Sequence, residues 1–234
     1  HLRLFVSSGA FLPPALQQGW EDLGVIVMQG YGATETGTGS CTTLDDHGLG
    51  TVGRPPAGIQ MRLAEDGEVQ FKGRPVFRGY WRNPEATAAA FTEDGWYHTG
   101  DIGHLDDEGR LILSGRMKDI IVLPNGFNVY PEDIENALRI VGIRDSVVLE
   151  VAAGRIEAIL LGGEPEADPA ATRARLDEAV KAANASLGPN QRIAGWRLWP
   201  DEDFPRTHTL KVKRAPVRDW VAADAPLPTA TRDG

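Results

Sequence analysis

Several residue types are scarce in this chain, and each scarcity excludes a class of protein. A single cysteine, Cys41, excludes an internal disulfide and suits a reducing compartment, so we expect a cytoplasmic protein. Lysine and arginine total 24 against 33 aspartates and glutamates, and the resulting net charge of −9 argues against nucleic acid as a partner. No apolar run approaches the roughly 18 residues that a membrane span needs.

What the chain does contain suits a folded protein. Its 234 residues, 41% of them hydrophobic, are enough to bury the core of one large domain or two small ones. The sequence starts at His1 and enters the apolar run Leu2 to Val6 at once. Because a natural N-terminus seldom begins inside a buried strand, we expect this sequence to be one piece of a longer polypeptide.

The first half alternates strand-type and helix-type patterns. Residues 2–6 and 25–28 predict strands, and residues 13–23 between them predict a helix from their apolar spacing. Strand, helix, strand and a glycine-rich loop form the edge of an α/β unit, where ligands bind at the carboxyl ends of strands. Short strands are then expected at 60–63, 68–72 and 76–80, with a hairpin turn at Asp66-Gly67.

The most specific pattern runs from Ser114 to Glu135. It opens on the charged residues Arg116, Lys118 and Asp119, and the β-branched run 120–123 then predicts a strand. The sequence Pro-Asn-Gly at 124–126 predicts a turn, and proline at position 131 predicts the start of a helix. By itself this segment would fit a plain strand, turn and helix with an exposed charge pair.

This segment resembles the hinge and first loop of the C-terminal domain of adenylate-forming enzymes, the superfamily of acyl-CoA synthetases, luciferases and peptide-synthetase adenylation domains. The matching pattern is G-R-x-K-D-x-I, a glycine, then N-V-x-P-x-x-I-E. The resemblance implies that Arg116 reaches a ribose, that Lys118 is the pivot between two domains, and that Gly126 leaves room for the pantetheine arm of CoA.

A second block, Y-G-A-T-E at 31–35, resembles the nucleotide loop of the same superfamily. The resemblance implies that Tyr31 stacks on adenine while Gly32 lets the backbone approach the nucleotide. Thr34 would donate a hydrogen bond to a phosphate oxygen, and Glu35 would hold Mg²⁺, an ion that prefers oxygen ligands. The alternative for this block alone is a surface loop rich in glycine and threonine.

A third block, Y-H-T-G-D at 97–101, resembles the superfamily's ribose-binding sequence Y-x-T-G-D. The resemblance implies that Asp101 accepts hydrogen bonds from the ribose 2′- and 3′-hydroxyls. It also implies that Gly9 and Ala10 line the second side of the adenine. His98 is not expected to be a general base, because the superfamily varies at that position.

The tail, residues 204–214, resembles the superfamily block P-x-T-x-x-G-K-x-x-R. Lys211 falls on its catalytic lysine, whose ammonium would meet the acyl carboxylate and the α-phosphate as charge builds during transfer. The sequence departs from the pattern at Leu210, where the family usually has glycine. A basic, exposed turn is the alternative for this block.

Together these patterns predict an α/β and α+β protein. Residues 1–115 would form the end of a large N-terminal adenylate-forming domain, namely an α/β edge and a small β-barrel subdomain. Residues 116–118 would be the hinge, residues 119–222 a small, mobile α+β lid domain, and residues 223–234 a flexible tail.

The expected function is that of part of an ATP-dependent acyl-CoA synthetase. Such an enzyme activates a carboxylic acid, here expected to be a fatty acid, as acyl-AMP with Mg²⁺ and ATP, and then transfers the acyl group to CoA. One alternative is acyl or aminoacyl transfer to a carrier-protein thiol. The other is a non-catalytic nucleotide-binding or interaction half that needs the missing N-terminal segment as a separate partner.

We predict that the chain alone does not form adenylate, because the sequence lacks the Ser/Thr/Gly-rich phosphate loop and its lysine that the superfamily uses for the ATP β- and γ-phosphates. Pyrophosphate exchange with a panel of carboxylic acids measures this. The expected result is no exchange above background; robust exchange with any acid would refute the prediction.

Overall fold

A computed structural model describes residues 2–162, 169–208 and 210–223 of the chain. The flexible tail predicted for residues 223–234 therefore lies outside the described residues beyond residue 223. The chain divides into two compact units, residues 1–118 and residues 119–234. Among the described residues, no helix is both long and apolar enough to cross a membrane.

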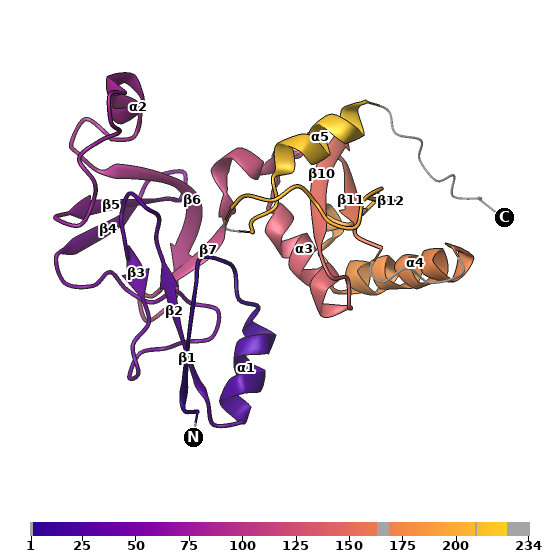
Figure 1. Cartoon of the computed structure of the whole chain (residues 1–234), viewed down its shortest axis with the longest axis horizontal. Coiled ribbons are helices and arrows are strands. Elements are labelled where there is room, and N and C mark those ends of the chain that lie inside the picture. The colour runs from indigo at the N-terminus through magenta and orange to yellow at the C-terminus, as the bar shows by residue number, and fades with distance from the viewer. Residues whose placement is uncertain (1, 163–168, 209, 224–234) are drawn as a thin grey trace. The chain divides into compact units, whose positions relative to one another are not determined.

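The first unit begins with a three-stranded sheet in the order β1 (Leu4–Ser8), β2 (Ile26–Tyr31) and β3 (Ser40–Cys41) (Figure 1). Strands β1 and β2 are parallel, with Ser8 opposite Gly30, while β3 is antiparallel to β2. Two parallel neighbours need a crossover, which α1 (Pro14–Asp22) supplies. The predicted helix and strands are thus confirmed, with their boundaries shifted by a few residues.

The expected apolar face of α1 is not a buried one. Leu16 and Leu23 are 52% and 74% exposed, and the buried residue of this helix is Gln17. The Gln17 amide oxygen accepts from the side-chain nitrogen of Gln29 at 3.0 Å and from the backbone N–H of Gly50 at 3.1 Å. Polar contacts therefore attach α1 to the sheet and to the following loop.

The second sheet of this unit is antiparallel and four-stranded, in the order β4 (Ile59–Leu63), β5 (Glu68–Gly73), β6 (Tyr97–Leu105) and β7 (Leu111–Arg116). Residues 52 and 53 extend it beyond β7 through two backbone hydrogen bonds with Leu111, each 2.8 Å long. Its buried side chains include Val69, Phe71 and Leu111. The predicted small barrel is thus a half-barrel of four strands within the described residues.

The strand expected at 76–80 is wrong. In this stretch Tyr80 makes an isolated bridge to Asn83, and Phe77 packs its ring 5.3 Å from that of Phe91. The Phe77 side chain is thus partly buried by a neighbouring aromatic ring and not by strand pairing. Helix α2 (Pro84–Ala89) follows, and the Asn83 side chain caps it by accepting from the N–H of Ala86 at 3.0 Å.

The chain enters the second unit through the 3₁₀ turn η1 (Met117–Asp119) and a short hairpin of β8 (Ile121–Val122) and β9 (Asn128–Val129). Helix α3 (Pro131–Ile140) leads to a sheet of β10 (Ser146–Ala152), β11 (Arg155–Leu160) and β12 (Gly195–Leu198) (Figure 1). Between the last two strands lie α4 (Pro169–Ser186) and the 3₁₀ turn η2 (Pro189–Gln191). Helix α5 (Arg214–Ala222), which the sequence analysis did not predict, follows the tail motif.

Alternation along the strands places two cores on opposite faces of this sheet. Val148 and Ala158 point into a core with α3 and α4, and their neighbours Val147 and Ile159 point into a core with α5. All four side chains are fully buried, and each of the larger ones, the two valines and the isoleucine, contributes about 1.5–3 kcal/mol to stability. The sheet is therefore the rigid base to which the loops of this unit are attached.

Candidate functional site

Three of the predicted nucleotide residues meet in the first unit. The Asp101 carboxylate, whose side chain is 14% exposed, accepts a 2.6 Å hydrogen bond from the Tyr31 hydroxyl and lies 2.8 Å from Nε of Arg116. Tyr31 ends β2, while Asp101 and Arg116 face each other across β6 and β7. Seventy residues of sequence separate Tyr31 from Asp101, so the fold, rather than the local sequence, brings them together.

The Tyr31 hydroxyl is a fixed hydrogen-bond donor. Burial, and next the negative charge of Asp101 and the hydrogen bond to it, raise the pKa of this hydroxyl well above its usual value. The phenol therefore stays protonated at neutral pH and donates to the carboxylate. Its ring lies 5.9 Å from the ring of Phe71, which steadies the side chain from within the sheet.

The loop after Tyr31 is tightly folded on itself. A side chain at Gly32 would place its Cβ only 1.9 Å from the carbonyl oxygen of Gly37, so glycine is required there. The buried Thr36 hydroxyl accepts from the N–H of Ala33 at 2.9 Å. These contacts turn the backbone sharply and leave Thr34 exposed at the tip of the loop.

Glu35 is held at one side of this loop. Its carboxylate accepts from the Tyr80 hydroxyl at 3.0 Å, and its backbone oxygen accepts from the N–H of Phe77 at 2.7 Å. Burial, followed by the hydrogen bond to Glu35, raises the pKa of the Tyr80 hydroxyl, which therefore remains a donor. The sequence analysis did not identify Tyr80 as a partner of this acid.

A single carboxylate suits magnesium only when phosphate oxygens complete the coordination. The described residues include no cluster of three or more His, Cys, Asp or Glu side chains that could hold a metal ion. Mg²⁺ is commonly bound through one or two carboxylates together with substrate phosphates and waters. Glu35 fits that arrangement as one ligand, and its assignment to Mg²⁺ stays a prediction.

Gly9 and Ala10 leave the sheet at the same edge as Tyr31. They follow Ser8, the last residue of β1, and Gly9 has a φ of 80°, which a glycine adopts readily. Because β1 and β2 are parallel, their carboxyl ends lie side by side at one edge of the sheet. This is the edge of an α/β sheet at which ligands bind, and the contact with adenine stays a prediction.

In the second unit, Gly126 lies at the tip of the β8–β9 hairpin. Its φ is 80°, its N–H donates to the carbonyl oxygen of Leu123 at 2.8 Å, and an added Cβ would meet nothing within 4 Å. The adjacent Asn125 accepts from the N–H of Phe127 at 3.0 Å. Glycine thus serves the turn conformation, and the space beside it is open.

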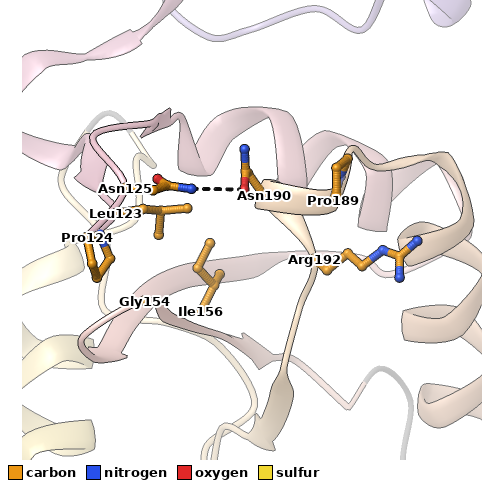
Figure 2. A pocket seen from close by; sticks show the side chains of 8 residues that line it. All are labelled: Leu123, Pro124, Asn125, Gly154, Ile156, Pro189, Asn190 and Arg192. Carbon is orange, nitrogen blue, oxygen red and sulfur yellow. Dashed lines mark hydrogen bonds between the residues drawn. The ribbon is translucent and has the colours of Figure 1, made fainter.

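A cavity of about 300 Å³ lies next to this hairpin (Figure 2). The Asn125 amide donates to the Asn190 amide oxygen at 3.3 Å, and Figure 2 shows Leu123 and Ile156 near this bond. The lining combines apolar side chains, two amides and one arginine: Leu123, Pro124, Asn125, Gly154, Ile156, Pro189, Asn190 and Arg192. The cavity thus offers apolar surface with hydrogen-bonding groups at its edge.

Lys211 is exposed in the loop before α5. Its N–H donates to the Thr207 hydroxyl at 3.1 Å, and its carbonyl accepts from the N–H of Thr207 at 2.8 Å. Arg206 fixes the loop by donating to the carbonyl oxygen of Leu210 at 3.0 Å and by forming ion pairs with Asp145 and Asp203. Thr207 and Arg206 therefore hold the backbone of Leu210 and Lys211.

Leu210 adopts the backbone conformation that glycine favours. Its φ is 64°, in the left-handed region, and its side chain is 74% exposed. Leucine in this conformation accepts strain of about 1–2 kcal/mol to keep the turn.

The last residue of the tail motif anchors α5. Arg214 donates to the Glu135 carboxylate at 2.6 Å and lies 3.7 Å from Asp119, the first residue of this unit. Burial raises the pKa of the Glu135 carboxyl to about 7, despite the opposing charge of Arg214. The motif's arginine thus joins α5 to α3 and to the segment after Lys118.

Comparisons with known proteins identify the family of this chain. Residues 1–81 match the family model described as AMP-binding enzyme. Over 248 aligned residues, which take in 95% of this chain, it is 36% identical to the long-chain-fatty-acid–CoA ligase FadD15 of Mycobacterium bovis. The chain belongs to the adenylate-forming enzymes. It spans 41% of the length of FadD15, so it covers about two fifths of that relative.

This adenylate-forming chain is also similar to a plant ligase and to a solved bacterial structure. The long-chain-fatty-acid–[acyl-carrier-protein] ligase AEE15 of Arabidopsis thaliana is 33% identical over 201 residues, which cover 75% of this chain and 28% of that protein. The crystal structure of ATP-bound MatB from Rhodopseudomonas palustris superposes with a TM-score of 0.75 at 29% identity, covering 93% of this chain and 45% of MatB.

The structure brings together some predicted residues of this adenylate-forming chain. Tyr31, Asp101 and Arg116 are in direct contact, and Gly32 starts the loop that carries Thr34 and Glu35. Lys118 ends the first unit, whereas Gly126 and Lys211 belong to the second. The roles of all these residues stay predictions.

Besides Tyr80, sequence reasoning missed Glu68. It is 4% exposed, and its carboxylate contacts the chain on either side of Thr99. The available signal was a glutamate directly after the Asp66-Gly67 turn, at the start of a predicted strand. A buried carboxylate cannot be recognised from that pattern.

We expect Leu210→Gly to stabilise the second unit. Relief of the left-handed strain is worth about 1–2 kcal/mol, and the greater freedom of glycine in the unfolded chain offsets about 0.5–1 kcal/mol of it. The free energy of unfolding should therefore rise by about 0.5–1 kcal/mol. Hydrogen exchange of the core amides of β10 and β11 measures it for this unit alone.

The matched control is Leu210→Ala, which removes the same exposed side chain but keeps a Cβ and its strain. The alanine variant should exchange like the wild type. Equal protection of the glycine and alanine variants would show that the backbone conformation of Leu210 is not strained.

Proposed function

We propose that this chain is part of an AMP-forming acid–thiol ligase that converts a carboxylic acid, in particular a fatty acid, to its CoA thioester. The observation that carries the proposal is the contact of Tyr31, Asp101 and Arg116 at one carboxylate. FadD15, a fatty-acid–CoA ligase, is similar along 95% of the chain and supports the substrate class.

Asp101 is the group that would bind the ribose. An ionised carboxylate accepts up to about four hydrogen bonds, so it is a suitable acceptor for two vicinal hydroxyls. Tyr31 contacts one carboxylate oxygen and Arg116 the other, so both oxygens are held in position. A carboxylate held in this way binds a ribose without having to reorganise.

The first reaction would take place at the phosphate end of the nucleotide. A carboxylate oxygen of the acid bonds to the α-phosphorus of ATP, the bond from that phosphorus to the pyrophosphate oxygen breaks, and acyl-AMP and pyrophosphate form. Thr34 would donate to a phosphate oxygen, and Glu35 would hold Mg²⁺, which supplies charge neutralisation at the phosphates. Lys211 would place its ammonium against the charge that builds on the acid and the α-phosphate.

The second reaction would be thiol transfer. The CoA sulfur attacks the acyl carbon, the bond from that carbon to the AMP oxygen breaks, and the thioester and AMP leave. We propose that the second unit rotates about Lys118 between the two reactions, replacing Lys211 with the Gly126 loop. The open space at Gly126 and the amide-lined cavity beside Asn125 suit a pantetheine chain, which carries amides of its own.

Transfer to a carrier protein is the second candidate. AEE15 is named as an acyl-carrier-protein ligase, and it is similar over 75% of this chain. Both activities share the adenylate step and differ only in what presents the thiol. Thioester formation by the complete protein with free CoA, compared with a phosphopantetheinylated carrier protein, separates them.

The third candidate is a non-catalytic half that binds a nucleotide or a separate N-terminal partner. Both β1 and α1 carry exposed apolar residues, among them Leu4, Val6 and Leu16. We propose that these residues pack against the remaining part of the adenylate-forming domain, since the chain spans only 41% of FadD15.

Calorimetric titration with AMP tests the proposal. The wild-type chain should bind AMP weakly, and Asp101→Ala should weaken binding at least about tenfold, since each hydrogen bond to a charged group is worth about 1.5–3 kcal/mol. Asp107→Ala, which removes an exposed acid from the nearby hairpin, is the matched control and should bind like the wild type. A pure interaction module would bind no AMP in any variant.

A further inference from the structure

An irregularity in the second sheet of the first unit produces the position of Asp101. Opposite β5, Glu68 pairs with Ile102 and Gln70 pairs with His98. Thr99, Gly100 and Asp101 therefore all face Val69, so β6 carries two extra residues at this point. Such bulges re-aim side chains and leave backbone groups without ladder partners.

Glu68 supplies one of the missing partners. One carboxylate oxygen accepts from the N–H of Gly100 at 2.9 Å, and Gly100 has a φ of 68°, which suits the bulge. The other oxygen lies 2.6 Å from Nδ1 of His98 and accepts from the Gln70 amide at 2.9 Å. The carboxylate is thus clamped from one side and bound to the bulge on the other.

A second set of hydrogen bonds, made by Thr99, links the bulge to Asp101. The Thr99 hydroxyl donates to the carbonyl oxygen of Val69 at 2.6 Å and accepts from the N–H of Asp101 at 3.0 Å. Gly100, held by Glu68, lies between these two residues. Displacement of Gly100 would therefore turn the Asp101 backbone and move its carboxylate away from Tyr31 and Arg116.

We propose that Glu68 is a positioning residue for nucleotide binding: through Gly100 it sets the direction in which Asp101 presents its carboxylate to the ribose. The inference rests on the proposed function, because it assigns the ribose to Asp101. It also gives His98 a part, which is to hold the Glu68 carboxylate and not to transfer protons.

Two substitutions separate the effect of the length of the Glu68 side chain from the effect of its charge. Glu68→Gln keeps an oxygen at the same distance from the N–H of Gly100 and loses the charge. Glu68→Asp keeps the charge and is one methylene too short for that bond. The exposed Glu65, in the same hairpin, provides the control Glu65→Ala.

The readout is the preference for AMP over 2′,3′-dideoxy-AMP, measured as a ratio of dissociation constants by calorimetry. The wild type, Glu65→Ala and Glu68→Gln should prefer AMP by about tenfold or more, as loss of hydrogen bonds to a charged acceptor implies. In Glu68→Asp this ratio should fall to about one third of the wild-type ratio or lower. In the Asp101→Ala background, Glu68→Asp should cause no further loss of AMP affinity, whereas a merely structural role would weaken binding further.

The possible outcomes are distinguishable once circular dichroism shows that both Glu68 variants are folded. If the wild type binds both nucleotides equally or not at all, the proposed function and this inference both fail. If the wild type prefers AMP, the proposed function stands. The role of Glu68 is then overturned by any of three results: neither Glu68 variant loses the preference, both lose it, or Glu68→Gln alone loses it.

Discussion

The Asp101 carboxylate is the point on which the functional account of the first unit depends. It gathers a hydroxyl from β2 and a guanidinium from β7, and these two elements belong to different sheets. A carboxylate that is 14% exposed would be costly to bury without such partners. The same partners that offset this cost also fix its oxygens at the edge where β1 and β2 end.

The surrounding chain maintains this arrangement through irregular backbone. In the first unit the extra residues in β6 present Asp101, and the tight loop after Tyr31 requires glycine at position 32. Regular ladders and buried alternation supply the rigid parts between these points. The candidate site residues therefore lie where regular structure ends or is interrupted, and the regular structure determines where they point.

The sequence predicted most elements because their signals are local. Apolar alternation, the Asp66-Gly67 turn and prolines at helix starts each act within a few residues. Strands β4 and β5, on either side of that turn, were therefore predicted correctly. The predictions were wrong where contacts between distant residues determine the local structure. Phe77 packs against the ring of Phe91, so residues 76–80 form no strand. In α1 the buried residue is Gln17 and not a leucine. Resemblance identified Tyr31, Asp101 and Arg116, but it could not reveal Glu68, whose partners appear only when β5 and β6 pair.

A crystal structure of the chain grown with AMP tests the central claim most directly. The account predicts that both ribose hydroxyl oxygens lie about 2.5–3.2 Å from the Asp101 carboxylate, with Tyr31 and Arg116 still bound to it. An ordered AMP whose ribose contacts other residues, with Asp101 unchanged and facing solvent, would contradict it.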